Sequence, residues 1–246
     1  MSLFGRPALA DGDRLEVAGA PVRLKVNRRA RRVSLRLDRT RREIVATAPS
    51  IRRLSEAAAF ARERADWIAE RLAELPRTEV LSPGMLIELF GEPVRLESGS
   101  GRARWVAPPD GSTPRIVAMG EGEGFARAVI LVIRKRALEV LTARTLHYAA
   151  RLGAPAPKVA VADAKSRWGS CRPGPRGAAG SIRYSWRLAL APFEVADYVA
   201  AHECAHLLEL NHGPRFWALV RELVGDERRH RDWLRAEGAR LHAFGR

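Results

Sequence analysis

Three histidines and one glutamate near the C-terminal end of the chain have the spacing of a metal-dependent hydrolase. The stretch from His202 to His206 reads H-E-C-A-H, and a third histidine follows at His212. Residues four apart lie on one face of a helix, so the imidazoles of His202 and His206 can bind a single ion. Glu203 points beside that face, where its carboxylate can take a proton from a metal-bound water. The pattern predicts a hydrolase with one Zn²⁺ per chain, and with Glu203 as its general base.

The third ligand is the least constrained member of this site. His212 follows His206 by six residues, and a turn after the helix can return its side chain to the metal. This histidine spacing matches that of metzincins, but Glu209 stands where those enzymes have a glycine, and no methionine follows the motif. We expect His212 to be the third ligand. Glu222 and Glu227, on the helices that follow, are the alternatives.

The two cysteines, Cys171 and Cys204, form neither a C-x-x-C pair nor a disulfide framework. Cys204 lies inside the histidine motif, where a thiolate ligand is one reading. A free cysteine between two such histidines is more typical of a small buried hydrophobe, and Cys171 is expected to be structural as well.

The elements that must position these side chains are a helix for the motif and a small sheet before it. Pro192 suits the start of a helix, which is expected to run to about residue 210. Further helices are expected at 54–75, 124–152, 214–224 and 227–242, from helical spacing of apolar residues. Alternating patterns predict strands at 15–17, 22–26, 33–37, 43–48, 158–162, 166–171 and 181–190, with a hairpin turn at 38–41. Short apolar runs at 86–90, 94–96, 105–106 and 116–119 predict a small antiparallel sheet.

The chain as a whole has the composition of a globular protein. It has 246 residues, of which 46% are hydrophobic and 29% charged. No apolar stretch is long enough to cross a bilayer, and no secretory leader begins the sequence, so a cytoplasmic protein without a membrane partner is expected. We expect an α+β protein: a loose tail (1–12), a β-rich N-terminal half (13–122), and a zincin-like half (123–246), with the two halves forming one continuous domain. A long helix connects them, and no internal repeat is expected.

The formal net charge is +15, and the densest run of basic residues lies in the N-terminal part of the sequence. Between Arg28 and Arg42 there are eight arginines and one acid, Asp38. Such a field attracts polyanions, so nucleic acid bound through the basic N-terminal strands is one hypothesis. A solvated strand face in a generally basic protein is the other.

Several stretches together resemble a known family. These are Arg167–Cys171 (RWGSC), Ser181–Leu188, Tyr198-Val199 before the histidine motif, and Asn211–Trp217 (NHGPRFW). They resemble the YgjP-like metallopeptidases, a family related to the SprT group of zinc peptidases. The resemblance extends weakly over the N-terminal half. One departure is Ser185, where such sequences often carry an asparagine in the strand before the motif helix.

The resemblance implies zinc bound by His202, His206 and His212, with Glu203 catalytic and a peptide or protein as substrate. Part of the family has also been labelled a nucleoside triphosphate pyrophosphatase, so a metal-dependent pyrophosphohydrolase is the first alternative. A nucleic-acid-binding module with structural zinc is the second. Structural zinc sites usually have four protein ligands, which argues against that reading.

Substrate contacts are expected from the strand at 181–190, taken as a sheet edge along which an extended peptide pairs. The developing oxyanion requires a donor. The candidates for that donor, or for other substrate contacts, are Tyr184, Tyr198, Arg183 and His230. Four aromatic residues can line a pocket, although core packing is the favoured role for each: Trp168, Trp186, Phe216 and Trp217.

Overall fold

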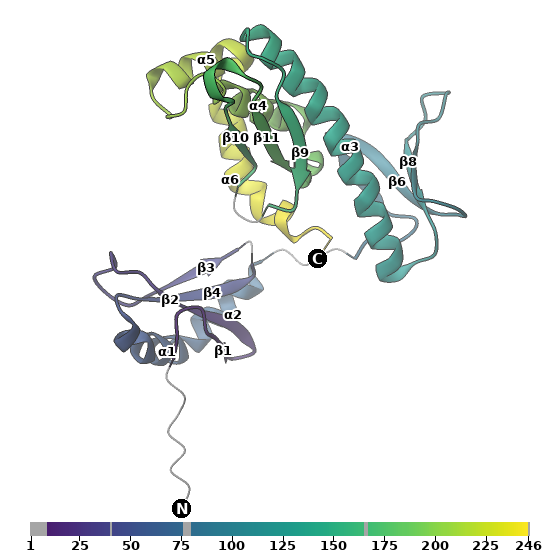
Figure 1. The fold of residues 1–246 in the computed structure, drawn as a ribbon. Coiled ribbons are helices and arrows are strands. Elements are labelled where there is room, and N and C mark those ends of the chain that lie inside the picture. The colour runs from purple at the N-terminus through teal and green to yellow at the C-terminus, as the bar shows by residue number, and fades with distance from the viewer. Residues whose placement is uncertain (1–8, 40, 76–79, 165–166, 246) are drawn as a thin grey trace, which may run out of the picture. The chain divides into compact units, whose positions relative to one another are not determined.

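The computed structural model describes residues 9–39, 41–75, 80–164 and 167–245. The chain divides into two compact units, Met1–Arg77 and Thr78–Arg246, called here the first and second unit (Figure 1). Both contain strands and helices, which confirms the expected α+β class. Most of the expected tail (residues 1–8), one turn position (Thr40) and the start of the strand at 166–171 lie outside the described residues. Among the residues described, no helix is both long and apolar enough to cross a membrane.

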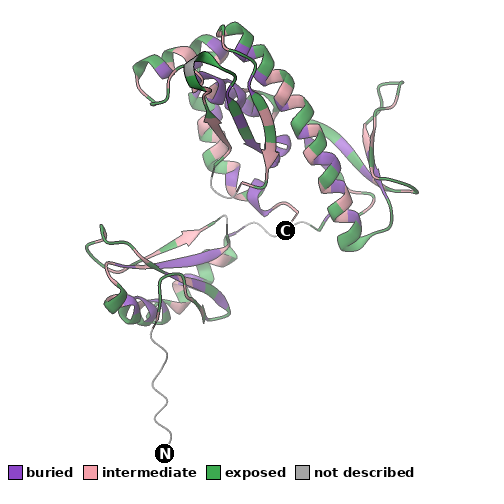
Figure 2. Cartoon of the chain, in the orientation of Figure 1, coloured by how far each residue is buried: buried purple, intermediate pink, exposed green. Residues whose placement is uncertain are grey.

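The first unit is a four-stranded sheet with two short helices on one face (Figure 1). Its elements are β1 (Arg14–Val17), β2 (Ala20–Val26), β3 (Ser34–Asp38), β4 (Glu43–Ala48), the 3-10 turn η1 (Ile51–Arg53), α1 (Leu54–Glu63) and α2 (Ala65–Ala73). The strand order is β1-β2-β4-β3, so β3 is a free edge of this sheet. Figure 2 shows that β4 is buried along most of its length, because α1 packs its alanines and Leu54 against it.

The helix expected at 54–75 is divided in two. Arg64 adopts φ −107° and ψ 28°, outside the helical region, so α1 ends before it and α2 begins after it. Neither glycine nor proline stands at the break, and the sequence therefore carries no local signal for it.

The described part of the second unit contains two sheets, four helices and two short 3-10 turns. Its elements are β5 (Leu86–Leu89), β6 (Glu92–Ser98), β7 (Arg104–Val106), β8 (Arg115–Ala118), α3 (Gly122–Arg151), β9 (Lys158–Ala162), β10 (Gly169–Arg172), η2 (Pro175–Gly177), β11 (Ser181–Ser185), η3 (Trp186–Leu190), α4 (Phe193–Ala205), α5 (Pro214–Val224) and α6 (Arg228–Ala243). One continuous core joins β5–β8, α3, β11 and α4. The expected division at 122/123 falls inside this unit, because α3 packs on both sheets.

The sheet β5-β6-β8-β7 was expected from the sequence to be antiparallel, but it contains one parallel pair. Strand β6 pairs in parallel with β8, with Leu96 opposite Ile116, while the outer pairs are antiparallel. Period-two patterns identify strands but contain no information on which strands pair, and that is why the expectation was wrong in this point.

The two four-stranded sheets are repeats of one motif, in sequence as well as in pairing. Residues 15–24 read LEVAGAPVRL and residues 87–96 read IELFGEPVRL, with six identities in these ten positions. Both strand orders include one parallel pair in the same place, β2 with β4 and β6 with β8. Each copy turns at two residues of positive φ, 52° and 74° at 18–19 and 54° and 83° at 90–91. The expectation of no internal repeat was wrong.

The third sheet has the order β10-β11-β9, which places β11 in the centre. The strand expected at 181–190 ends at Ser185, and the next five residues form the buried 3-10 turn η3. The sheet edge expected along this strand is therefore wrong: β11 pairs with β10 on one side and with β9 on the other. The free edges belong to β10 and β9.

Candidate active site

Helix α4 presents the first part of the histidine motif. It begins after Pro192 and ends at Ala205, with His206 as the C-terminal cap. The expected helix continued to Leu210, but Leu208 and Leu210 are 51% and 67% exposed, so no burial stabilises further turns. Ending the helix early leaves a loop that returns the chain toward α4 and places His212 beside the two earlier histidines.

The three histidines converge on one point. One nitrogen from each of His202, His206 and His212 lies within 4.8 Å of the others, and this is the group of metal-binding side chains found among the described residues. The Nε2 atoms of His202 and His212 are 3.2 Å apart. Burial first, and then the charges of the neighbouring histidines and Arg231, lowers the pKa of His202 to about 3. Burial also lowers the pKa of His206, so both rings are held neutral, which is the form that binds metals.

Hydrogen bonds on the far side of two rings orient them. The Nδ1 atom of His206 lies 3.0 Å from the carbonyl oxygen of Glu209. Because a carbonyl can only accept, Nδ1 carries the proton and Nε2 is left as a free electron pair. The hydroxyl of Tyr198 lies 3.4 Å from Nδ1 of His202, which again leaves Nε2 on the inner side.

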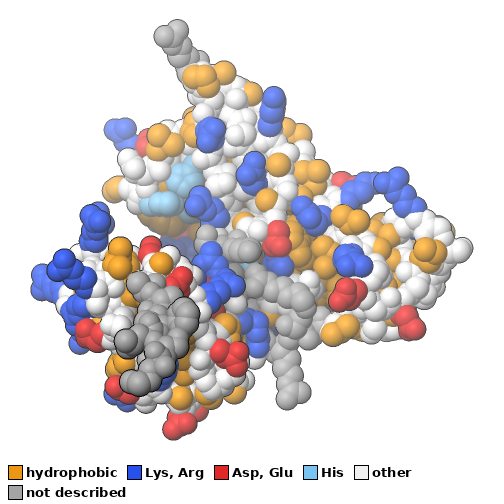
Figure 3. Space-filling model, turned by 60° about the horizontal axis from the view of Figure 1, so that its bottom comes forward, with side chains coloured by type: hydrophobic (Ala, Val, Ile, Leu, Met, Phe, Trp, Pro, Cys, Tyr) orange, Lys and Arg blue, Asp and Glu red, His pale blue; other side chains and the backbone are white. Residues whose placement is uncertain are grey.

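Two aromatic side chains of α5 pack against the three imidazoles and the loop that carries His212. Phe216 is fully buried, and its ring centroid lies 4.8, 4.5 and 4.7 Å from those of His202, His206 and His212. The indole Nε1 of Trp217 donates to the carbonyl oxygen of His212 at 3.1 Å and so fixes the loop. Figure 3 shows a group of histidine side chains reaching the surface of the second unit.

Glu203 is buried beside the histidines and packed against β10. It is 5% exposed, and burial raises its pKa to about 7, opposed by the charge of Arg167. A Cβ atom added to Gly169 would lie 2.4 Å from Oε1 of Glu203, so this position requires glycine unless the carboxylate moves. The sequence motif contained Gly169 but gave no reason for it; the close approach to Glu203 supplies one.

The alternative ligands lie elsewhere. Among the described residues, Glu222 and Glu227 do not join the group of potential ligands, and the carboxylate of Glu227 lies 3.8 Å from Arg221 instead. The thiol of Cys204 is 3.5 Å from the carbonyl oxygen of Thr145, and burial raises its pKa to about 12. Cys204 therefore packs on α3 as a neutral thiol.

Two of the four candidate donors point away from the site. Tyr184 is fully buried and lies 2.8 Å from Oγ1 of Thr145. Thr145 donates its own proton to Leu141 at 2.6 Å, so Tyr184 must be the donor in that pair and has no proton left to give. Arg183 is exposed on the face of β11 opposite to that of Tyr184, because the side chains of neighbouring strand residues point to opposite faces.

The other two candidates form a stack behind His202. The ring of Tyr198 stacks on that of His230, with centroids 5.6 Å apart, and both residues are buried. His230 also lines a hollow of about 300 Å³ with Arg144 and Tyr148, away from the three histidines. Tyr198 contacts an imidazole of the triad, whereas His230 acts on it only through Tyr198.

The remaining aromatic candidates are structural. Trp186 is 2% exposed within the core, and Trp168 stacks on His242 at 4.7 Å. Ser185, the position where an asparagine was expected, is buried, and its hydroxyl has no hydrogen-bond partner among the described residues. No polar role at that position is supported.

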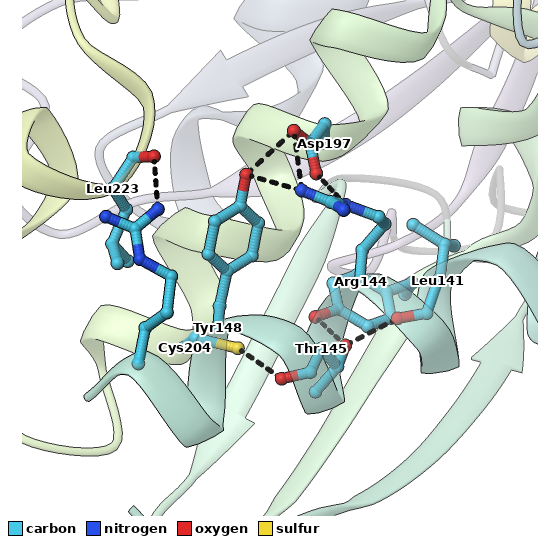
Figure 4. Close-up of polar contacts among 9 residues, drawn as sticks. Leu141, Arg144, Thr145, Tyr148, Asp197, Cys204 and Leu223 are labelled. Atoms are coloured by element: carbon cyan, nitrogen blue, oxygen red, sulfur yellow. Dashed lines mark hydrogen bonds and ion pairs between the residues drawn. The ribbon is translucent and has the colours of Figure 1, made fainter. Parts of the chain in front are cut away.

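A polar network fastens α4 to α3 (Figure 4). Asp197 accepts hydrogen bonds from Nε of Arg144 at 2.5 Å and from the hydroxyl of Tyr148 at 2.7 Å. Burial, with the bond to Asp197, raises the pKa of Tyr148 to about 12. The network lies one turn before His202 on the same helix, so it fixes the position of the histidine motif relative to the core.

The YgjP-like metallopeptidase domain model matches residues 31–237, more than four-fifths of the chain. The chain belongs to the YgjP-like metallopeptidase family. Searches of curated proteins and of solved structures found no significant match. The family assignment agrees with the histidine triad, which is able to hold a metal ion. The region matched to this YgjP-like domain extends over both units, including strands β3 and β4 and helices α1 and α2 of the first.

Proposed function

We propose that this YgjP-like protein is a zinc-dependent peptidase in which His202, His206 and His212 hold the metal and Glu203 is the general base. The observation that carries the proposal is the convergence of the three rings beside a buried carboxylate, with Nε2 of His206 freed by its partner at Nδ1. Three imidazoles, of which burial holds those of His202 and His206 neutral, suit zinc and leave a coordination position open. Zinc bound there would supply Lewis-acid activation of a water and of a carbonyl.

Glu203 has the position and the environment for proton transfer. Its carboxylate neighbours the first histidine on α4 but is not a member of the ligand group. It is held between α4 and the backbone of Gly169. In the proposed reaction this carboxylate takes a proton from the attacking water and gives it to the amine that leaves as the peptide bond breaks.

The substrate strand is proposed to pair with β10 in place of β11. Strand β10 is a free edge of its sheet, and its first residue, Gly169, lies against Glu203. An extended peptide added to this edge would bring successive peptide bonds past the carboxylate. This arrangement, a sheet edge beside the motif helix, is what a zincin-like half requires.

The test compares hydrolysis of an unfolded protein and of nucleoside triphosphates by zinc-loaded wild type, Glu203→Gln and Glu222→Gln. Removal of a general base lowers kcat by about 10² to 10⁴. We expect peptide products from the wild type and Glu222→Gln, and a loss of that size in Glu203→Gln. Bound zinc is measured in each, with His212→Ala as the variant that loses it.

The outcomes separate the alternatives. Undiminished peptide hydrolysis by Glu203→Gln, or zinc retained with full affinity in His212→Ala, contradicts the proposed site. Release of pyrophosphate and a nucleoside monophosphate from nucleoside triphosphates, without peptide products, would assign the pyrophosphohydrolase reaction instead. Full activity of Glu222→Gln is also required, because Glu222 was the alternative ligand.

A further inference from the structure

The first unit contains a groove between the free edge of its sheet and its two helices. It has a volume of about 450 Å³. Its lining comes from β3 and the two residues before it (Arg32, Val33, Ser34, Leu35), and from α1, α2 and the residue between them (Phe60, Arg64, Trp67). An adjoining hollow of about 340 Å³ shares Arg32, Val33 and Phe60 and extends over α1. It contains Glu63 and the Arg53–Glu56 pair, whereas the lining of the groove itself has no acidic residue. All of these residues belong to the first unit.

The internal repeat identifies this groove as the place where the two copies differ. Leu35 lies opposite Ala46, and Ala46 pairs with Leu24 of the repeat. In the other copy the equivalent row is Leu96, Ile116 and Trp105. The indole of Trp105 thus occupies the position of Leu35, and Arg136 of α3 lies over it at 5.4 Å. In the second unit this position is filled by the indole of Trp105, which Arg136 covers. In the first unit the smaller Leu35 leaves the space open as the groove.

Two features of the groove wall specify its ligand. Among the described residues, strand β3 pairs with β4 alone, so alternate backbone groups on its outer side have no strand partner there. Arg32 and Arg64 are exposed on the two sides of the groove, and no described carboxylate forms an ion pair with either. Figure 3 shows Lys and Arg side chains gathered at one end of the first unit. The groove therefore offers strand pairing, apolar side chains and two uncompensated positive charges.

We propose that this groove binds an extended acidic peptide, which adds to β3 as a further strand. Its apolar side chains pack on Leu35 and Trp67, and its carboxylates meet Arg32 and Arg64. This gives the chain a polypeptide docking surface that shares no residue with the histidine site. The proposal does not rest on the peptidase reaction, because the binding needs neither the metal nor Glu203.

Nucleic acid is less well suited to the same groove. Base stacking would require an open aromatic face. Arg64 lies over Phe60 at 5.6 Å and Arg71 over Trp67 at 5.9 Å, so a base competes with a guanidinium for one of the two faces of each ring. A phosphate backbone can accept from the outer N–H groups of β3 but offers no donor to its outer carbonyl oxygens.

The test is fluorescence anisotropy of a short labelled peptide of alternating glutamate and valine, titrated with full-length Glu203→Gln protein. Three variants are added to that background. Leu35→Trp fills the groove with the residue that the other repeat carries, so it is expected to fold. Arg32→Gln/Arg64→Gln removes the charges, and Arg29→Gln/Arg62→Gln removes two exposed arginines that do not line the groove.

We expect Leu35→Trp and Arg32→Gln/Arg64→Gln to weaken binding by at least about tenfold, equivalent to 1.4 kcal/mol. The control variant should remain within about twofold. N-methylation of alternate peptide bonds in the probe should abolish binding, because strand addition needs its N–H groups. The proposal would be overturned if the Glu203→Gln protein and both groove variants bound the peptide with equal affinity. It would also be overturned if labelled oligothymidylate bound more tightly than the peptide and lost affinity in the groove variants. Intact melting curves for the double glutamine variant keep the test valid even if Leu35→Trp is unstable.

Discussion

Tyr198 lies between His202 and the buried ring of His230, and it is the side chain that orients the first proposed ligand. Replacing it with phenylalanine keeps the stack and removes only the hydroxyl at 3.4 Å from Nδ1 of His202. Loss of such a partner typically lowers metal affinity by about 10- to 100-fold. We expect Tyr198→Phe to bind zinc at the lower end of that range, measured by competition with a chromogenic chelator.

Tyr184→Phe is the matched control for that measurement. Its hydroxyl bonds to Thr145 inside the core and not to a histidine. The expected result is reduced stability of about 1 kcal/mol with unchanged zinc affinity. Equal zinc affinities for wild type and Tyr198→Phe would show that the hydroxyl does not orient His202.

Gly169 controls the position of Glu203. Alanine at this position places a Cβ atom 2.4 Å from Oε1 of the glutamate, and the buried side chain must move to make room. Misplacement of a catalytic group by about 1 Å costs roughly 10² in rate. Gly169→Ala is therefore expected to lower kcat by about that factor while one zinc per chain remains bound. Normal turnover in this variant would mean that Glu203 adapts freely, or that it is not the base.

Cys171 provides a pH-dependent test of the packing around Glu203. Burial, and then the charge of Glu203, raises the pKa of its thiol to about 12. An acid with a raised pKa stays protonated at pH 8, and only the thiolate reacts with disulfide reagents. The native protein should thus react far more slowly than free cysteine at pH 8 and faster as the pH rises. Rapid modification at pH 8 in the folded state would contradict this environment.

At the level of elements, the junction between α3 and α4 carries the histidine motif. Asp197→Ala removes the carboxylate that accepts hydrogen bonds from Nε of Arg144 and from the hydroxyl of Tyr148. Hydrogen bonds to a charged group contribute about 1.5 to 3 kcal/mol. We expect a loss of about 2 kcal/mol in the free energy of unfolding, measured by urea denaturation.

Asp232→Ala is the control for the α3–α4 junction. This aspartate pairs with Arg235 on the surface of α6, and both side chains are 69% exposed. Such pairs contribute little, so no measurable change is expected. Similar effects of the two substitutions would show that the Asp197 network does not fasten α4.

The elements that the sequence predicted well are those with strong local periodicity. The long helix expected at 124–152 corresponds to α3, and the strand expected at 43–48 has the bounds of β4. The five residues after Ser185 alternate like a strand, yet Arg187 is buried with its neighbours, so the alternation there does not reflect two faces. Periodicity alone cannot distinguish such a buried 3-10 turn from a strand.

The candidate site was predictable where one helix determines it and not where tertiary contacts do. The shared face of His202 and His206 follows from the helix, and the position of His212 required only a turn. The central position of β11, and the approach of Gly169 to Glu203, arise from pairing between strands that are distant in sequence. Neither could be inferred from residue types at those positions.

At the scale of the whole molecule, the repeat was hidden because its turns lack the usual signals. Two-residue hairpins are normally recognised by Asn-Gly or Asp-Gly, whereas the copies here have Ala18-Gly19 and Phe90-Gly91. The first unit repeats the sheet motif without a histidine triad among its described residues. Its docking groove and the proposed metal centre are thus separate properties of two compact units.

The division into two units gives a prediction for metal binding. The core of the first unit is built from β2, β4 and α1, while the three histidines adjoin the core around α4. A ligand that binds only the folded state stabilises it by about 2.7 kcal/mol at one hundred times its Kd. Zinc at that concentration should therefore slow amide hydrogen exchange in α4 and α5 and leave α1 and β4 unchanged, as measured by mass spectrometry.

His212→Ala, which removes a proposed ligand from an exposed loop, should abolish the zinc-dependent protection without altering exchange in the metal-free protein. Equal protection of both units by zinc would mean that they unfold together. Protection that persists in His212→Ala would place the metal elsewhere. The expected pattern, with zinc acting on α4 and α5 alone, would instead show that the metal centre stabilises the unit that contains it.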